Sequence, residues 1–346
     1  MLSMYAENIQ KTMRKNVFLF SGQGSQYSGM GQELAAITPA SAAIYECAAD
    51  ILGFDLKGLC FHGEETQLAQ TIVSQPAIFA TSLVAWEAAK SKGISCSAVA
   101  GHSLGEYAAM VASGMLSVED GFRAIKARSE AMQACAQRSE GGMVAILGMD
   151  AETIKKICGQ IQGYVVPVNY NSPAQTVIAG EKSSLEQAVA ALTSAGAKRA
   201  VPLAVSAAFH SKMMQPAAEQ FAAEIQSISF KKPTVAFYSN VTGGILTDFE
   251  DMPAYLAKHI VSPVQFVSEL QLMQENGYQN FIELGYLRMN RNCYSRQEVE
   301  VFRGEVAGDL VPLVRRIKEG QARRIGVEKL KFYVDLAFFP EGNPQP

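Results

Sequence analysis

The sequence predicts an α/β fold with a largely parallel sheet, interrupted by a smaller inserted unit. Along most of the chain, short apolar runs that end in glycine-containing loops alternate with stretches of helical periodicity. One of these loops, residues 101–105, has the spacing of a sharp strand–turn–helix corner. A separate segment, residues 140–205, carries its own complete pattern of strands and helices.

The first elements of the chain indicate the parallel sheet. Residues 17–20 and 97–100 are short apolar runs, and each leads directly into a tight loop that contains glycine, as buried strands do. Residues 77–92 and 119–135 place apolar side chains at helical spacing, which predicts two amphipathic helices. Because these strands and helices alternate, we expect the strands to pair in parallel.

The inserted unit is expected to follow the order strand, helix, strand, strand, helix, strand. The strands are predicted at 143–148, as a pair within 165–180 and at 197–205, and the helices at 151–161 and 183–195. This order is that of the ferredoxin-like split motif. We therefore expect a ferredoxin-like small subdomain at 140–205, inserted between core segments 16–139 and 206–346.

Composition and charge exclude several classes of protein. Hydrophobic residues make up 48% of the chain and charged residues 18%, which excludes a disordered chain. Lys and Arg number 30 against 33 Asp and Glu, a net charge of −3, so no strongly basic nucleic-acid surface is expected. The polar N-terminus lacks the apolar segment of a signal peptide, and no apolar run approaches the ~20 residues of a membrane span. We expect a cytoplasmic protein that is a monomer.

The segment Gly101-His102-Ser103-Leu104-Gly105 fits the G-x-S-x-G pattern of a nucleophile elbow, a sharp turn that exposes a reactive serine between a strand and a helix. Ser103 would lie at the N-terminus of a helix, where the dipole favours developing negative charge. The main-chain N–H of Leu104 would point into the same space and form half of an oxyanion hole. Ser103 is thus a candidate nucleophile; a corner that carries a chance serine is the alternative.

A nucleophilic serine needs a base, and the chain has four histidines. The side chain of His102 should diverge from its neighbour Ser103. His62 is expected in an exposed loop, and His259 at the end of a helix. His210 follows a strand-like run and lies on a loop of small residues that leaves it accessible. Elimination favours His210 as the general base, with a purely structural histidine as the alternative.

Two further positions are candidates on weaker grounds. The loop Gly22-Gln23-Gly24 follows the first strand, and could aim a second N–H at the oxyanion, although a plain glycine turn has the same pattern. Arg128 lies within a largely apolar helix, from which an arginine ordinarily extends to solvent.

Taken together, these pieces resemble the malonyl-CoA:acyl-carrier-protein transacylase family of fatty-acid and polyketide synthesis. The resemblance covers roughly residues 16–285, with the motifs in the family's order and at its spacing. The matching segments are FSGQGSQYSGMG at 20–31, SQPAI at 74–78, GHSLGEY at 101–107, KARSEAMQ at 126–133, VNYNSPAQTVIAG at 168–180, AFHSKMM at 208–214 and SPVQF at 262–266.

The resemblance implies an α/β-hydrolase-like core that carries a ferredoxin-like insertion. It implies that Ser103 is the nucleophile and His210 its base. A backbone carbonyl, here that of Gln265, would orient the histidine in place of a carboxylate. The main-chain N–H groups of Gln23 and Leu104 would form the oxyanion hole.

The resemblance also implies how the substrate is chosen. Arg128 would pair with the free carboxylate of a malonyl group, because a planar guanidinium binds a carboxylate bidentately. Phe209, just before the catalytic histidine, would favour malonyl over methylmalonyl by crowding an α-methyl group. His102 and Met132 would line the same substrate site.

The function implied is transfer of malonyl from malonyl-CoA to the phosphopantetheine thiol of an acyl carrier protein, through a malonyl-serine ester. Malonyl-CoA is a substrate, and no metal or prosthetic group is expected. The alternatives are an acyl hydrolase of the same fold that edits acyl-carrier thioesters, and a non-catalytic module that docks carrier proteins. The choice between fatty-acid and polyketide synthesis stays open.

The chain departs from the family pattern at two places. Ser21 stands where the family usually has proline before the glycine loop. After Gly285 the sequence Tyr-Leu-Arg replaces the usual Pro-Gly and leucine-containing helix. The tail that follows is basic, with 11 Lys and Arg against 6 Asp and Glu over residues 288–331, and its role is open.

Overall fold

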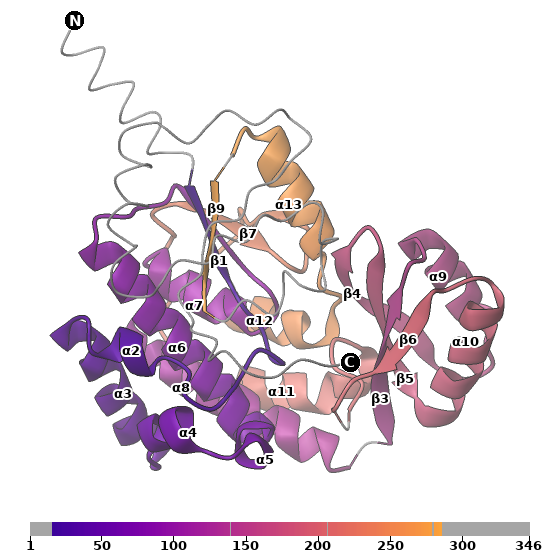
Figure 1. Cartoon of the computed structure of the whole chain (residues 1–346), viewed down its shortest axis with the longest axis horizontal. Helices are drawn as coiled ribbons and strands as arrows, with labels where there is room; N and C mark the ends of the chain where they lie inside the picture. The colour runs from indigo at the N-terminus through magenta and orange to yellow at the C-terminus, as the bar shows by residue number, and fades with distance from the viewer. Residues whose placement is uncertain (1–15, 139, 206, 279, 286–346) are drawn as a thin grey trace, which may run out of the picture.

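In the part of the chain that the structure describes, two β-sheets, each covered by helices, form a larger and a smaller unit that lie side by side (Figure 1). The computed structural model describes residues 16–285, with the exception of residues 139, 206 and 279. The basic segment 288–331 and the sequence after Gly285 lie outside the described residues.

The larger unit is built on a five-stranded sheet with the order β8-β7-β2-β1-β9. Its strands are β1 (Asn16–Phe20), β2 (Ala98–Gly101), β7 (Ala236–Ser239), β8 (Gly244–Ile245) and β9 (Asn280–Leu284). Four of them are parallel, and only β8 runs antiparallel to its neighbour β7. The predicted α/β class with a parallel sheet is therefore confirmed. The carboxyl ends of β1, β2 and β7 meet at one edge, where such sheets place their sites.

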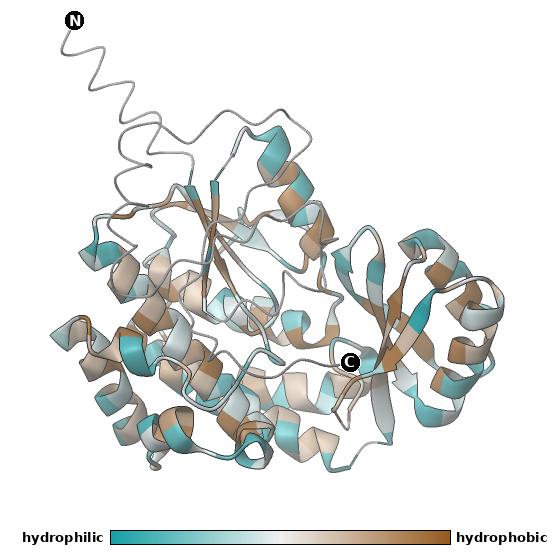
Figure 2. Cartoon of the chain, viewed as in Figure 1, coloured by the Kyte–Doolittle hydropathy of each residue, from teal (hydrophilic) through white to brown (hydrophobic). Residues whose placement is uncertain are grey.

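Helices cover both faces of this sheet because its central strand is apolar on both sides. Phe18 and Phe20 of β1 pack into the core formed with α6, α7 and α8. Val17 and Leu19 point to the other face, where they pack with α13. Figure 2 shows the central strand of this sheet as an apolar segment, and the outer helices as a mixture of polar and apolar residues. A strand buried on both faces is typical of a parallel sheet.

In the sequence, the helices of the larger unit lie both before and after the smaller unit. They are α2 (Gln32–Ala35), α3 (Pro39–Leu52), α4 (Leu56–His62), α5 (Glu65–Leu68), α6 (Thr71–Ser91), α7 (Gly105–Ala112), α8 (Val118–Ala136), the 3-10 helix η1 (Lys212–Met214), α11 (Gln215–Glu224), α12 (Met252–Val261) and α13 (Phe266–Glu275). The predicted helix at 77–92 corresponds to α6, which ends one residue earlier, and the one at 119–135 lies within α8. Helix α6 begins earlier than predicted and continues through Pro76, whose surroundings are buried.

Local sequence explains where several of these helices begin. The Thr38 side chain accepts the Ser41 N–H ahead of α3, with Pro39 in the first turn, and Ser117 accepts the Asp120 N–H ahead of α8. His62, expected in an exposed loop, is instead the last residue of α4, although it is exposed as expected.

The smaller unit is a four-stranded antiparallel sheet with the order β4-β5-β3-β6. Its elements are β3 (Gly141–Leu147), α9 (Ala151–Cys158), β4 (Val165–Ser172), β5 (Gln175–Glu181), α10 (Lys182–Ser194) and β6 (Arg199–Pro202). Residues of both helices and of the sheet form a hydrophobic core of their own. The chain thus follows the predicted order of strand, helix, two strands, helix and strand.

A short parallel bridge joins the two units beside the carboxyl edge of the larger sheet. Asn169 of β4 pairs with Val264, just before α13. The Val264 N–H donates to Val168 at 2.8 Å, and the Tyr170 N–H donates to Val264 at 2.9 Å. This bridge fixes the segment between α12 and α13, which contributes to the site described below.

Across residues 16–285, leaving aside the three positions noted above, no helix has the length and apolar character needed to cross a membrane.

Candidate active site

Ser103 lies on a strained turn between β2 and α7. Its φ is +53°, and among the described residues only Ser103 and His210, at +60°, combine a side chain with a positive φ. Such a conformation costs of order 1–3 kcal/mol, and it is found at functional sites. The flanking glycines are required: a Cβ on Gly101 would lie 2.0 Å from the Gly105 carbonyl carbon, and one on Gly105 would lie 2.1 Å from the Phe20 oxygen. This is the geometry of a nucleophile elbow.

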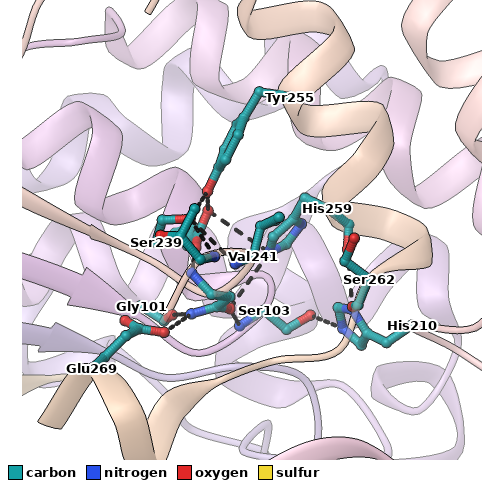
Figure 3. A network of polar contacts seen from close by, with 12 residues as sticks. Gly101, Ser103, His210, Ser239, Val241, Tyr255, His259, Ser262 and Glu269 are labelled. Carbon is teal, nitrogen blue, oxygen red and sulfur yellow. Dashed lines mark hydrogen bonds and ion pairs between the residues drawn. The ribbon is translucent and has the colours of Figure 1, made fainter. Parts of the chain in front are cut away.

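The structure brings Ser103 and His210 together. Ser103 Oγ lies 2.7 Å from His210 Nε2. His210 Nδ1 faces two main-chain oxygens, of Ser262 at 3.1 Å and of His259 at 3.2 Å (Figure 3). Because carbonyl oxygens only accept, Nδ1 carries the ring proton, and the lone pair of Nε2 faces the serine hydroxyl. The arrangement allows the imidazole to take a proton from Ser103.

The prediction that the Gln265 carbonyl orients His210 was wrong. Gln265 is the N-cap of α13, and its carbonyl already accepts the Glu269 N–H at 3.1 Å. The carbonyls that hold His210 come from the end of α12 instead, at His259 and the C-cap Ser262. The last carbonyls of a helix have no partner within it, so they are available to a neighbouring donor.

Burial sets the charge of His210. Desolvation, then the positive charge of Arg128, lower the pKa of His210 from 6.5 to about 3. The imidazole is therefore neutral near pH 7, which is the form that accepts a proton.

Arg128 is a buried cation beside Ser103. Its side chain is 1% exposed, and it donates from Nη2 to Ser103 Oγ at 3.2 Å. The guanidinium lies over the Tyr107 ring, 5.5 Å from the centroid. In the part of the chain that the structure describes, no carboxylate forms an ion pair with it, and Nε has no hydrogen-bond partner. The expectation for a lone arginine in such a helix, extension to solvent, was wrong.

An unpaired buried guanidinium is costly in the free protein, because water no longer solvates it. Desolvation accordingly lowers the pKa of Arg128. A carboxylate that entered beside Ser103 would offset this cost.

The glycine loop after β1 lies directly against the elbow. A Cβ on Gly22 would lie 2.5 Å from the His102 carbonyl oxygen. Within the described residues, the main-chain N–H groups of Gln23 and Leu104 donate to no protein acceptor. Gln75, which the sequence analysis did not single out, donates to Gln23 Oε1 at 3.3 Å and so links the loop to α6.

The other predicted substrate residues occupy different positions around this centre. His102 is turned to Asn171, with Nε2 2.8 Å from Oδ1, and so does not compete for Ser103. Met132 is buried four residues after Arg128 in α8, a spacing that places both on one helix face. Phe209 is buried beside His210 at 7% exposure.

A network of buried polar side chains, which the sequence did not predict, lies behind the elbow (Figure 3). Asn240, fully buried after β7, contacts Ser103, Gly101 and two glutamates through hydrogen bonds. Burial raises the pKa of Glu106 to about 8, and raises that of Glu269 well above its usual value. The only signal in the sequence is a polar residue at the carboxyl end of an apolar strand.

Comparison with known proteins agrees with this geometry. The family model for the acyl transferase domain matches residues 17–300, so the chain is a member of the acyltransferase class of proteins. The malonyl CoA-acyl carrier protein transacylase of Bacillus subtilis is 40% identical over 276 residues, which cover 79% of this chain and 87% of the relative. That of Escherichia coli K12 is 38% identical over 276 residues, covering 79% of this chain and 89% of the relative.

Solved structures give the same result. A malonyl-transacylase in complex with a type II polyketide synthase acyl-carrier protein superposes with a TM-score of 0.76 and 37% identity, over 80% of this chain and 90% of that one. A malonyl CoA-acyl carrier protein transacylase from Clostridium perfringens superposes with a TM-score of 0.79 and 35% identity, over 89% and 98% of the two chains. The chain belongs to the malonyl CoA-acyl carrier protein transacylase family.

Proposed function

We propose that the protein transfers malonyl groups from malonyl-CoA to the phosphopantetheine thiol of an acyl carrier protein. One observation carries the malonyl assignment: a fully buried arginine, which pairs with no carboxylate among the residues that the structure describes, contacts the nucleophile Ser103. The names of the relatives support the same substrate and partner. Acyl transfer alone would not require a buried cation, whereas the free carboxylate of malonyl does.

The proposed first half-reaction forms a malonyl-serine ester. His210 Nε2 takes the Ser103 proton while Oγ attacks the thioester carbonyl carbon. The N–H groups of Gln23 and Leu104 hold the oxyanion of the tetrahedral intermediate. The carbon–sulfur bond then breaks, and the CoA sulfur leaves with the proton that His210 carries.

The second half-reaction runs the same steps with the carrier thiol. The thiol gives its proton to His210 and attacks the ester carbonyl, and Ser103 leaves as its hydroxyl when the proton returns. The carbonyls of Ser262 and His259 keep the Nδ1 proton of His210 in place while Nε2 gains and loses its proton. These steps need no metal or prosthetic group.

We also propose roles for the residues around this centre. Phe209 would limit space at the α-carbon of the acyl group and so favour malonyl over methylmalonyl. Met132 and His102 would line the acyl site, with the His102 ring fixed by Asn171.

At the level of the fold, we propose an α/β-hydrolase-like core at 16–139 and 206–346 and a ferredoxin-like subdomain at 140–205. The parallel sheet with its elbow supports the first part. The order β4-β5-β3-β6 with all pairs antiparallel supports the second. A monomer that acts in the cytoplasm stays a prediction.

The test of the function is competition between transfer and hydrolysis. Purified protein is mixed with malonyl-CoA or acetyl-CoA and a panel of holo carrier proteins from fatty-acid and polyketide systems, and the intact mass of each carrier is followed. We expect malonyl to appear on carriers faster than free malonate is released, with acetyl transfer much slower. Release to water that exceeds transfer on every carrier would instead identify an acyl hydrolase, and no turnover would indicate a docking module.

A further inference from the structure

We infer that Asn240 is a positioning residue that holds the strained main chain of the nucleophile elbow, so that Ser103 meets His210. The inference rests on the proposed acyl transfer by Ser103. It concerns a residue that touches neither the acyl group nor the reacting atoms.

One side-chain amide bridges the turn on both sides of His102. Asn240 Oδ1 accepts the Ser103 N–H at 2.6 Å, and Nδ2 donates to the Gly101 carbonyl at 2.7 Å. The first contact holds the strained residue itself, and the second holds the end of β2 from which the turn departs. The two contacts together fix the direction in which Ser103 leaves the strand.

Asn240 can serve as a bracket because its own position is fixed from several elements. It is 0% exposed and follows directly after β7, the strand that pairs with β2. Its Nδ2 also donates to Glu269 Oε1 of α13 at 2.7 Å, and its main-chain N–H donates to Glu106 of α7. The bracket therefore joins the end of β2, the start of α7 and helix α13.

The chemistry of the amide matches this task. Only an amide offers an acceptor and two donors on one rigid planar group, and all three are used here. Leucine of the same size would leave the buried Ser103 N–H and Gly101 carbonyl without partners. Aspartate keeps the acceptor but, once ionised, loses the donors and adds a third carboxyl beside Glu106 and Glu269.

If Ser103 is displaced, the rate of acylation should fall while the affinity for the substrate stays the same. Under the proposed function the Arg128 guanidinium binds the acyl carboxylate, whereas the 2.7 Å contact to His210 depends on where Oγ lies. A displacement of about 1 Å can lower a rate about 100-fold. The inference thus predicts a change in kcat with KM largely unaltered.

The test compares Asn240→Ala with a matched control, Asn16→Ala. Asn16 is equally buried, at 2% exposure, and its amide also bonds at both ends, to Ser95 and Asn280. It lies at the opposite end of β1 from the elbow. Single-turnover acylation by malonyl-CoA is followed by intact mass, which gives the maximal rate of ester formation and the half-saturating concentration, and thermal unfolding is measured for each variant.

For Asn240→Ala we expect the maximal acylation rate to fall about 100-fold, with the half-saturating concentration within about 3-fold of wild type. The Tm of Asn16→Ala should fall by about as much as that of Asn240→Ala, while its acylation rate stays within about 3-fold of wild type. Equal rate losses in both variants, or a loss confined to substrate affinity, would overturn the inference. If wild type itself forms no ester, the proposed function fails, which is a distinct result.

A second variant serves if Asn240→Ala does not fold. In Asn240→Asp, a protonated carboxyl keeps an acceptor for Ser103 and a donor for Gly101, whereas a carboxylate keeps only the acceptor. The groups that face it are Glu106 of α7, Glu269 of α13 and His259 of α12, with the charge of Arg128 of α8 beyond Glu106. The acylation rate of this variant, relative to wild type, should fall as pH rises. A ratio that stays constant with pH, or equals one throughout, would overturn the inference.

Discussion

At the scale of one residue, the burial of Arg128 lowers the stability of the folded protein and places a positive charge beside Ser103. The protein buries a guanidinium that no carboxylate neutralises in the described part of the chain, and this raises the free energy of the folded state. Since it donates to Ser103 Oγ, the charge lies where an acyl group must enter. A carboxylate on that acyl group would complete the pair.

Replacing Arg128 by alanine should therefore change substrate preference. Truncating one partner of a buried charge pair costs about 2–5 kcal/mol, so kcat/KM for malonyl-CoA should fall by the corresponding factor. Acetyl-CoA loses no ionic contact and should react as well as before or better. Arg123→Ala is the matched control, because Arg123 lies on the same helix but is exposed and paired with Asp120 at 2.7 Å. Equal losses for malonyl and acetyl would mean that Arg128 is structural.

Phe209→Ser should widen the acyl site next to His210. One methyl group in an apolar pocket is worth about 1–3 kcal/mol, so the preference for malonyl over methylmalonyl should relax without inverting cleanly. The measurement is the ratio of the two kcat/KM values in variant and wild type. If that ratio does not change, Phe209 does not face the α-carbon.

The sequence predicts some of these residues better than others, for physical reasons. Ser103 is recoverable because the turn itself demands glycines at both flanks, and that demand is local. The carbonyl partners of His210 are not, because they depend on where α12 ends and how it packs. Asn240 and Glu106 meet only in the fold, 134 residues apart, so no local pattern relates them.

At the scale of elements, the loop after β1 and the turn after β2 form one unit. Their strands are adjacent and parallel, with Phe20 opposite Gly101, so the two loops leave the sheet together. We expect the close approach of Gly22 to His102 to keep the Gln23 N–H at the elbow. An oxyanion site built in this way has its donors in place before the substrate binds.

Gly22→Ala should break that arrangement. The added methyl group would lie 2.5 Å from the His102 oxygen, so the loop must move and carry the Gln23 N–H away. Loss of one oxyanion donor lowers kcat about 100-fold, with KM for malonyl-CoA little changed. Gly159→Ala, where the nearest atom is at an ordinary 3.4 Å, controls for the substitution itself. A Gly22→Ala variant with wild-type kcat would exclude this loop from the oxyanion site.

At the scale of the whole molecule, stability should depend on the buried titratable groups behind the site. Burial raises the pKa of Glu106 to about 8, so its contribution is complete below its ordinary pKa of 4.5 and is lost as pH rises through 8. His210, with its pKa lowered to about 3, acts oppositely and loses stability as pH falls from 6.5 towards 3. Between pH 6.5 and 8 His210 is neutral in the folded state and finishes losing its proton in the unfolded state, so the decline of stability in this window comes from the buried carboxyls.

Glu106→Gln should flatten the decline of stability in that window. One fully buried carboxyl contributes up to about 2 kcal/mol between pH 6.5 and 8, and an amide does not titrate. Denaturant unfolding at several pH values measures the change, and exposed Glu186→Gln is the control. Residual slope is expected from Glu269, whose pKa is also raised. A variant as steep as wild type would mean that Glu106 is ionised in the folded protein.

The sequence predicts those parts of the fold that depend on local patterns of residues. The order of elements in the smaller unit follows from alternating strands and helices. The bridge between Asn169 and Val264 joins segments 95 residues apart, and nothing in either segment alone predicts that pairing. Pro76 likewise suggests a helix boundary by its local preference, but packing around α6 carries the helix through it.

The most direct measurement of the central claim is the intact mass of the protein after mixing with malonyl-CoA alone. Wild type should gain a single malonyl group, located on the peptide that contains Ser103, and should lose it when holo carrier protein is added but not when the apo form is added. Ser103→Ala should gain none while staying folded with a Tm close to that of wild type, since only one hydroxyl group is removed. A malonyl adduct that persists in Ser103→Ala, or one that holo carrier cannot discharge, would contradict the account.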